Sequence, residues 1–202
     1  MSYDSETRLL AAIAYGESSP KNVYEEMAAI ASVMVRQMKA RGYQTMAIFT
    51  TKERSFSFVV ADGNQRFAKL MKSTDAQIEK SPEMSVAIAA AQNAFADGVD
   101  HSNGAYFWDG ADIKSNYKAH QKVRAGIYFS DPRHNIYDVK ATDGEYELSI
   151  VVKKRRRGKI VQERKVIGTY PYTYESTAAH GGTIFWKFGS EWLKISRGKA
   201  HR

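Results

Sequence analysis

Apolar residues recur at helical spacing through much of the first hundred residues. This pattern predicts four helices: Ser5 to Gly16, Tyr24 to about Lys39, Arg66 to about Lys72, and Pro82 to about Ala96. Asp4 or Ser5 is a suitable cap for the first helix, and Gly16 is a natural stop. A capping box at Asn22 to Glu25 would open the second helix. We therefore expect the first half of the chain to be helical.

Alternating β-branched and aromatic residues replace this pattern after Asp131-Pro132. Four segments have the alternation that is typical of strands: Ile136 to Lys140, Tyr146 to Lys153, Ile160 to Ile167, and Thr183 to Phe188. A shorter alternation at Phe56 to Val60 predicts one strand within the helical half, followed by a turn at Asp62-Gly63. The predicted fold class is therefore α+β, with a helical core and a small antiparallel β-rich C-terminal part.

Composition limits the kind of protein this can be. The chain has 202 residues, of which 43% are hydrophobic, so it can form one domain with a real core and a small appendage. It has no cysteine, which excludes a disulfide framework and a thiolate metal site. The five histidines show no convincing metal-ligand spacing, and no glycine-rich phosphate loop is present. We expect no metal and no cofactor.

The N-terminal segment, Met1 to Leu10, lacks the basic and then apolar pattern of a signal peptide. No apolar stretch approaches the roughly 20 residues that a bilayer span needs. We therefore expect synthesis in the cytoplasm without an evident signal peptide, and no membrane span.

Net charge indicates an anionic partner. The formal charge is +8 and the pI is about 9.5, which suits nucleic acid, a membrane surface or an acidic wall polymer. Six positive charges fall within Lys153 to Lys159, at the tip of a predicted hairpin. This tip is either a solvated turn or an anion-binding finger. Because no aromatic residues are interleaved with the charges, we do not expect it to bind nucleic acid.

Glu17 is the first candidate for chemistry. It follows directly on the predicted end of the first helix, where the helix dipole disfavours an anion, and Tyr15 would add an apolar wall. Both effects would raise the pKa of the Glu17 carboxyl. A carboxyl that stays protonated near neutral pH is what a glycosidase uses as a general acid. The alternative is an ordinary exposed glutamate in a turn.

Polar and aromatic residues elsewhere supply candidate substrate contacts. Ser57 and Asp62 could line a groove, although Asp62 also suits an ordinary turn before Gly63. Tyr106 and Trp108 lie in an aromatic loop whose rings would stack on a sugar or belong to the core, and Asp109 is its polar member.

His180 is the remaining candidate from the residues alone. It precedes Gly181-Gly182 and the last predicted strand. A single histidine in such a place has a structural role more often than a catalytic one, so both interpretations stay open.

Five segments occur in a particular order along the chain: the Ala14-Tyr15-Gly16-Glu17 turn, the Tyr24 to Met38 helix, the Phe56 to Gly63 segment, the Asn103 to Trp108 loop, and the His180 to Trp186 segment. Together they resemble the SleB-type cell-wall hydrolases. The resemblance covers roughly Leu9 to Trp108 and resumes near Thr177 to Lys187. The chain departs from the family at Arg36-Gln37, where the family often carries Asn-Arg.

The resemblance implies a lysozyme-like α+β fold and an enzyme that cuts the glycan strand of peptidoglycan, often as a lytic transglycosylase. It implies residues 1–130 as the lysozyme-like catalytic core, residues 131–176 as a β-rich insertion with the basic hairpin, and residues 177–202 as a return strand and tail. Glu17 would be the catalytic acid. The expected substrate-binding residues are Ser57, Phe58, Asp62, Tyr106, Trp108, Asp109 and His180.

Two questions of function stay open at this point. The enzyme would be a lytic transglycosylase or a muramidase, because the sequence names no obvious second acid. A non-catalytic wall-binding module and a nucleic-acid-binding basic module are the alternatives to an enzyme.

A wall hydrolase without an evident leader would act at the cell wall or in the periplasm after delivery, as an antibacterial effector. A phage tail or lysis route is the rival to a secretion apparatus. The expected partners are peptidoglycan, a secretion apparatus and a cognate immunity protein that inhibits the enzyme in the producing cell.

Overall fold

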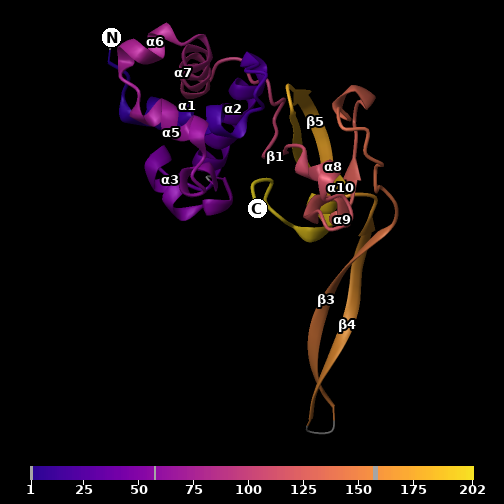
Figure 1. Ribbon diagram of the computed structural model, residues 1–202. Helices are drawn as coiled ribbons and strands as arrows, with labels where there is room; N and C mark the ends of the chain where they lie inside the picture. Colours follow the sequence, from indigo (N-terminus) through magenta and orange to yellow (C-terminus); the bar gives the residue numbers. More distant parts are fainter. Residues whose placement is uncertain (1, 57, 157–158) are drawn as a thin grey trace.

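A computed structural model describes residues 2–56, 58–156 and 159–202 (Figure 1). The helices of the first half gather at one end of the molecule, and a long two-stranded hairpin extends from the opposite end. The first-half helices are α1 (Ser5–Glu17), α2 (Tyr24–Ala40), α3 (Met46–Lys52), α4 (Phe58–Ala61), α5 (Gln65–Lys72), α6 (Asp75–Lys80) and α7 (Pro82–Phe95). Among the described residues, no helix combines the length and apolarity that crossing a bilayer requires.

Helices α1, α2 and α7 form the main core. Residues 10–14 of α1 and residues 27–31 of α2 are completely buried, so these turns have no face toward solvent. Many of the buried side chains are alanines, which allow helix backbones to approach closely. Larger side chains such as Ile13 and Ile30 fill the remaining space, and each contributes about 1.5–3 kcal/mol by leaving water. The predicted helical first half is confirmed.

The helix starts were predicted with mixed success. Asp4 caps α1 by accepting a hydrogen bond from the Thr7 backbone N–H, and Ser81 caps α7 as expected. The predicted capping box at Asn22 is wrong, because the N-cap of α2 is Val23 and makes no side-chain bond. Asn22 has a φ of 55° and accepts a hydrogen bond from Arg66 instead.

The segment from Phe56 to Val60 is not a strand. A 3₁₀ turn (Arg54–Phe56) is followed by α4, and Ser57 between them lies outside the described residues. Phe56 and Val59 are both buried, and their separation of three residues is a helical spacing. Five alternating residues were too few to distinguish this spacing from a strand.

A four-stranded sheet lies beside the helices, with the strand order β1 (Phe107–Asp109), β6 (Thr183–Phe188), β5 (Tyr174–His180), β2 (Ile127–Tyr128). Only the β2–β5 pair is parallel. Phe185 of β6 belongs to the helical core, whereas Ile184 and Trp186 belong to a second core that includes Ile113. The sheet therefore has a buried layer on each face, and the predicted α+β class is confirmed.

Short elements complete the second half: α8 (Asp112–Ser115), α9 (Gln121–Ala125), a 3₁₀ turn (Pro132–His134) and α10 (Ser190–Ser196). The predicted strand at Thr183 to Phe188 is confirmed as β6. The predicted strand at Ile136 to Lys140 is wrong. There the Asn135 side chain bonds both the N–H and the C=O of Val139, so the side chain replaces a neighbouring strand.

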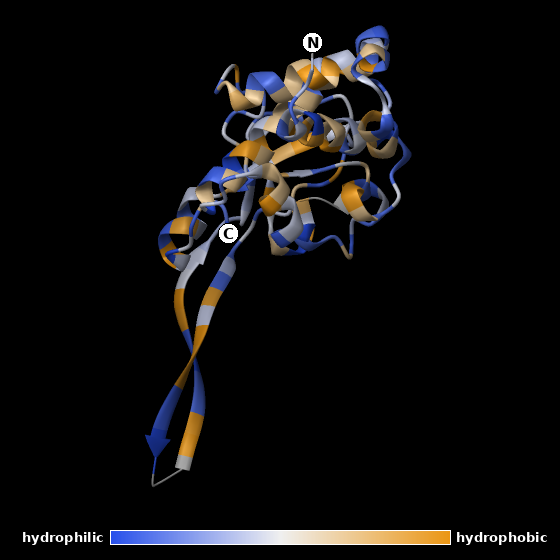
Figure 2. Ribbon diagram, turned by 90° about the vertical axis from the view of Figure 1, so that its left-hand side faces the viewer, coloured by the Kyte–Doolittle hydropathy of each residue, from blue (hydrophilic) through white to orange (hydrophobic). Residues whose placement is uncertain are grey.

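The hairpin consists of β3 (Tyr146–Arg156) and β4 (Lys159–Tyr170), which pair antiparallel. At its base the rings of Tyr146 and Tyr170 stack, with 5.6 Å between their centroids. Figure 2 shows its strands running away from the body as a narrow twisted ribbon. The predicted hairpin, with Lys153 to Lys159 toward its tip, is confirmed for the described residues.

One buried carboxylate connects the helices to the sheet. Glu26 is completely buried at the start of α2. Its carboxylate accepts hydrogen bonds from the Ser19 N–H and hydroxyl, at 3.0 and 2.7 Å. It also accepts bonds from the Gly182 N–H at 3.0 Å and the Thr183 hydroxyl at 2.8 Å. One side chain therefore joins α2, the loop that follows Glu17 and the β5–β6 turn.

The two glycines of that turn make this approach possible. Gly181 has a φ of 58°, and a side-chain carbon there would lie 2.0 Å from a Glu26 carboxylate oxygen. A side-chain carbon on Gly182 would lie 2.8 Å from the Ser19 side chain. The pair Gly181-Gly182 is therefore explained by the space that the buried carboxylate needs.

We predict that Glu26→Ala lowers the free energy of unfolding by about 3 kcal/mol or more, because it leaves several buried donors without an acceptor. Urea unfolding measures this loss. The control is Glu25→Ala, which removes an exposed carboxylate from the same helical turn and should change the free energy by less than about 0.5 kcal/mol. Equal effects of the two substitutions would contradict the role given to Glu26.

Candidate functional site

A pocket of about 630 Å³ lies where the end of α1 meets β1. Its lining combines acids, bases and aromatic rings: Glu17, Arg41, Ser55, Phe56, Phe107, Trp108, Asp109, Gly110, Asp112, His120, Gln121, Lys122, Tyr174, Phe188 and Arg202. Such a mixture of apolar walls and a few converging polar groups is typical of a small-molecule or saccharide site.

Glu17 is the last residue of α1 and lies in the pocket wall. Burial is the largest cause that raises the pKa of its carboxyl. Hydrogen bonds from the Trp108 side chain and the Val59 backbone oppose this rise, while the charges of Asp62 and Asp112 add to it. The sequence also predicted a raised pKa for Glu17, but from the helix dipole and the Tyr15 side chain. In the structure the main cause is burial of the carboxyl.

Close packing positions Glu17. A side-chain carbon on Gly16 would lie 3.2 Å from both Asn64 and Phe67, so the end of α1 sits directly against the start of α5. Asn64 Nδ2 donates to the Gly16 carbonyl at 3.2 Å, and Arg66 donates to the Ser18 carbonyl at 2.6 Å. These bonds hold the backbone on both sides of the carboxylate.

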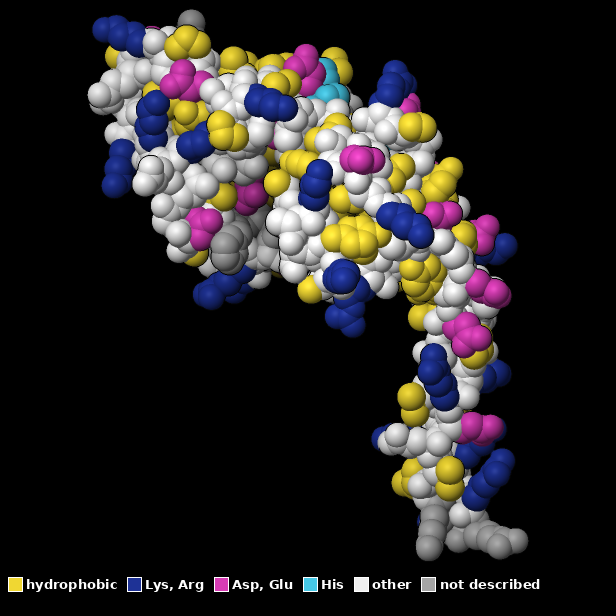
Figure 3. All heavy atoms as spheres, turned by 45° about the vertical axis from the view of Figure 1, so that its right-hand side comes forward, with side chains coloured by type: hydrophobic (Ala, Val, Ile, Leu, Met, Phe, Trp, Pro, Cys, Tyr) yellow, Lys and Arg dark blue, Asp and Glu magenta, His cyan; other side chains and the backbone are white. Residues whose placement is uncertain are grey.

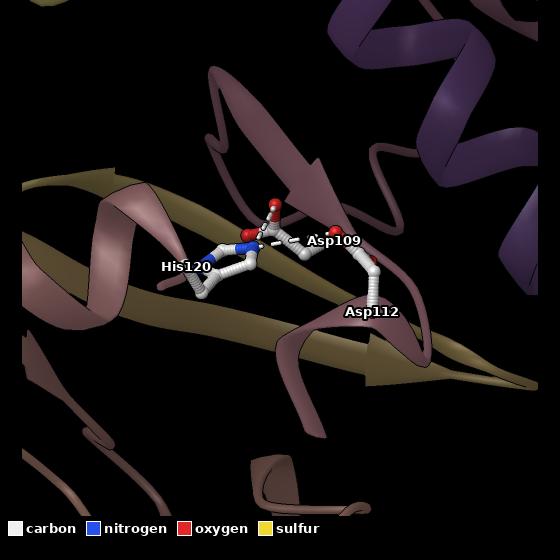
Figure 4. A group of neighbouring side chains, drawn as sticks. All are labelled: Asp109, Asp112 and His120. Atoms are coloured by element: carbon white, nitrogen blue, oxygen red, sulfur yellow. Dashed lines mark ion pairs between the residues drawn. The ribbon is translucent and has the colours of Figure 1, made fainter. Parts of the chain in front are cut away.

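The same pocket lining contains a charged cluster formed by Asp109, Asp112, His120 and Lys122, of which Figure 4 draws the first three. His120 Nε2 is 3.4 Å from Asp109 Oδ1 and 3.3 Å from Asp112 Oδ2. Lys122 Nζ is 2.8 Å from the same Asp109 oxygen. Asp109 and His120 are nearly buried, with 9% and 8% of their side chains exposed, whereas Asp112 is exposed. Both basic side chains, His120 and Lys122, therefore contact the same oxygen of Asp109.

This cluster has the composition of a metal site. Ligand atoms of Asp109, Asp112 and His120 lie within 4.8 Å of one another. The hydrogen bond that the His120 imidazole donates to the Asp109 carboxylate raises the pKa of His120 and so favours its charged form. Lys122 and a protonated His120 together balance the two carboxylates. With His120 in that charged form, the cluster is neutral on its own side chains.

Aromatic rings form the apolar walls of the pocket. The Phe107 ring lies 4.8 Å from Phe188 and 5.7 Å from Tyr174, and Phe56 lies 5.9 Å from Trp108, measured between centroids. Burial raises the pKa of Tyr174 to about 12, so its hydroxyl stays neutral. Neutral ring faces next to charged groups are suited to the apolar faces and hydroxyl edges of a sugar.

The structure brings together only part of the expected site. Trp108 and Asp109 line the same pocket as Glu17. Asp62 is an exposed turn residue whose carboxylate accepts from the Asn64 N–H, and only its charge reaches Glu17. Ser57 and the side chain of Phe58 lie outside the described residues.

Tyr106 and His180 lie elsewhere. The guanidinium of Arg36 is 5.7 Å from the centre of the Tyr106 ring, and neither residue is part of the pocket lining. The ring nitrogen Nε2 of His180 is 2.9 Å from the His101 carbonyl oxygen. In the described structure both expected residues have neighbours other than Glu17.

Arg36 and Gln37 of α2 form hydrogen bonds to the loop before β1. These are the two residues at which the chain departs from the SleB-type pattern. Arg36 donates to Asp100, Ser102 and the Ala105 carbonyl. Gln37 is completely buried and donates to the Tyr106 carbonyl at 2.8 Å. Arg36 and Gln37 thereby fix where β1, and with it Trp108, meets the end of α1.

Several lining residues were missed from the sequence. His120, Lys122 and Tyr174 carry no local motif, and the first two lie between Lys114 and Phe129, where the sequence pattern fits a helix poorly. Phe188 was correctly predicted to lie in a strand. The sequence did not show which strands pair with it, so it did not indicate the pocket. Their contribution becomes visible only when the sheet is assembled.

Comparison of the chain with protein-family models, with curated proteins and with solved structures gave no match. Function must therefore be argued from the pocket and its chemistry.

The charge on His120 generates a prediction. Its pKa in the folded protein is raised, so the stabilisation it provides is complete below the unfolded pKa of about 6.5 and is lost as pH rises through the folded pKa. The loss of unfolding free energy caused by His120→Gln should therefore be larger near pH 5.5 than near pH 8.5, in about 0.15 M salt.

His134 provides the matched control, because burial lowers its pKa. The sign is then reversed, because charging His134 at low pH opposes folding. The free energy of unfolding of the wild type should therefore increase relative to that of His134→Gln as pH rises. Urea unfolding at both pH values measures the two differences. The same trend for both histidines would contradict the charged cluster described above.

Proposed function

We propose that this chain is a lysozyme-like, SleB-like enzyme that cleaves the glycan strand of peptidoglycan, with Glu17 as the general acid. The observation that carries the proposal is the raised pKa of a carboxyl in the wall of a pocket lined by aromatic rings. A general acid must be protonated when substrate binds, and burial favours the protonated form of Glu17.

The pocket supports a saccharide as the substrate class. Trp108, Phe107 and Tyr174 supply apolar faces, and Asp109 and Arg41 supply polar groups in the same lining. A glycan strand presents both kinds of surface, because sugar rings have apolar faces and polar edges. This combination supports glycan binding better than binding of a purely apolar ligand.

The chemistry can be followed proton by proton. Protonated Glu17 gives its proton to the glycosidic oxygen as the bond from that oxygen to C1 breaks. Glu17 is then a carboxylate and can take a proton from the group that attacks C1. If that group is the 6-hydroxyl of the same muramyl residue, a 1,6-anhydro end forms; if it is water, a reducing end forms.

The cationic transition state needs negative charge nearby. Asp109 is suited to this role, because Lys122 and His120 stabilise its carboxylate in the same pocket as Glu17. Transglycosylation needs no further acid, whereas hydrolysis of the two-carboxylate kind would use Asp109 or Asp112 as the second group. Mass spectrometry of the released fragments distinguishes the two reactions by their ends.

We predict that Glu17→Gln lowers the release of peptidoglycan fragments at least about 100-fold, because the amide keeps the shape but cannot donate a carboxylic proton. Wild-type activity should fall as pH rises through the raised pKa of Glu17. The melting temperature of the variant should be unchanged or slightly higher, since an acid that favours its neutral form gains nothing from its charge. Dye release from labelled sacculi measures the rate.

The matched control is Glu25→Gln, which makes the same change at an exposed residue and should keep full activity. Full activity in a folded Glu17→Gln protein would remove Glu17 from the mechanism. Release of stem peptides alone would show that a different bond is cut.

A role as a delivered antibacterial effector gives a separate prediction. Expression in the cytoplasm should be harmless to a bacterium, because peptidoglycan lies outside, whereas expression with an added signal peptide should cause lysis. Glu17→Gln with the same signal peptide is the control and should not lyse the cells. Equal harmlessness of both wild-type forms, with sound folding, would contradict a toxin. If the protein is a toxin, we expect a cognate immunity protein to block the pocket at Glu17.

A further inference from the structure

The hairpin carries nearly all of the net charge of the protein. Residues 149–167 hold eight of the 30 Lys and Arg residues and one of the 22 Asp and Glu residues, which amounts to +7 of the formal +8. The rest of the chain, including the pocket, is close to neutral. In Figure 1 this charge lies at the end of the molecule that is farthest from the helices.

The two faces of the hairpin differ in composition. Strand pairing joins Val151 to Arg164 and Arg155 to Ile160, and residues alternate between the faces along each strand. One face, called here the Val151 face, consists between residues 149 and 166 of Ser149, Val151, Lys153, Arg155, Ile160, Gln162, Arg164 and Val166. The opposite face, called the Val152 face, consists of the described residues Ile150, Val152, Lys154, Arg156, Val161, Glu163 and Lys165.

Acid is present on only one of these faces. On the Val152 face, Glu163 pairs with Lys154 at 2.6 Å. Between residues 149 and 166, the described residues of the Val151 face include three cations and no acid, whereas Glu147 lies nearer the base of the hairpin. Arg164 Nε donates to Ser149 Oγ at 2.7 Å, so this guanidinium is held along the ribbon. Toward the tip, the three cations of the Val151 face therefore have no acid beside them on that face.

The Val151 face also exposes large apolar side chains. The exposed fraction is 64% for Val151, 72% for Ile160 and 45% for Val166. In Figure 2 hydrophobic and hydrophilic residues alternate along the ribbon, and Figure 3 shows Lys and Arg side chains spread along it among hydrophobic ones. Apolar and cationic groups are thus mixed at the scale of single residues.

We infer that the Val151 face binds the surface of an anionic lipid bilayer. Interfacial binding combines burial of apolar side chains with attraction of Lys and Arg to lipid phosphates, and this face presents both together. The long stems of Lys153, Arg155 and Arg164 can follow the apolar boundary while their charges stay at the headgroups.

Two other anionic partners fit less well. Single-stranded nucleic acid is held by aromatic stacking, and residues 147–169 contain no Phe, Trp or Tyr. The centre of a protein interface is depleted of charged residues, whereas here the cations stand between the apolar side chains. The Val151 face therefore favours a lipid surface over a nucleic acid or an acidic protein.

The test compares two charge-matched variants of the full chain. The Val151-face triple is Lys153→Gln, Arg155→Gln and Arg164→Gln. The Val152-face triple is Lys154→Gln, Arg156→Gln and Lys165→Gln, and both remove three positive charges. Co-sedimentation with vesicles of equal parts phosphatidylcholine and phosphatidylglycerol, at about 150 mM salt, measures the partition coefficient.

We expect the wild type to bind these vesicles and to bind pure phosphatidylcholine vesicles weakly. The Val151-face triple should reduce the partition coefficient about 100-fold, and the Val152-face triple less than about tenfold. Val151→Ser with Ile160→Ser should also reduce it, because it removes the apolar part of the contact. Circular dichroism confirms that each variant is folded. Since Glu17 takes no part, Glu17→Gln should bind as the wild type does.

Three results would overturn the inference. An absence of wild-type binding to the anionic vesicles would exclude a lipid surface. An equal loss in both triples would show a diffuse attraction to any polyanion. Tighter binding to an oligonucleotide or to polyglutamate than to the vesicles, at the same salt, would identify nucleic acid or an acidic protein as the partner.

Discussion

The buried carboxylate of Glu26 is the constraint on which the placement of the site depends. A buried charge is tolerated only when hydrogen bonds replace its water, and Glu26 receives them from the Ser19 loop and from the Gly182-Thr183 turn. The Ser19 loop is the continuation of Glu17, and the turn leads into β6, which pairs with β1. The same carboxylate therefore sets the distance between the catalytic candidate and the strand that carries Trp108.

The site lies between the two halves of the chain, so neither half forms it alone. The helices supply Glu17 from the end of α1, while the sheet supplies Trp108 and Asp109 from β1. Arg36 and Gln37 make a second connection, from α2 to the loop before β1. With Glu26 at one place and Arg36 at another, the sheet cannot shift along the helices without breaking buried hydrogen bonds.

How far the sequence predicted this structure depends on the range of the interactions. The long helices, the hairpin and β6 followed from periodicity because each repeats its pattern over six or more residues. Glu17 could be chosen from its local setting, whereas the only local signal at Glu26 is its place in the first turn of a helix. Its decisive partner Gly182 lies 156 residues further along the chain. The strands predicted at Phe56 to Val60 and at Ile136 to Lys140 failed because tertiary contacts and one asparagine side chain overrode short patterns.

The pocket places its ionisable groups in contrasting environments. Burial favours the neutral form of Glu17, while Asp109 lies against the basic side chains of Lys122 and His120. As pH rises, Glu17 gains a negative charge and His120 loses its positive charge, so both titrations make the pocket more negative. The pocket therefore holds a protonated Glu17 near a carboxylate only at pH values below these two titrations. A protonated general acid near a negative charge is the state that the proposed cleavage of a glycosidic bond requires.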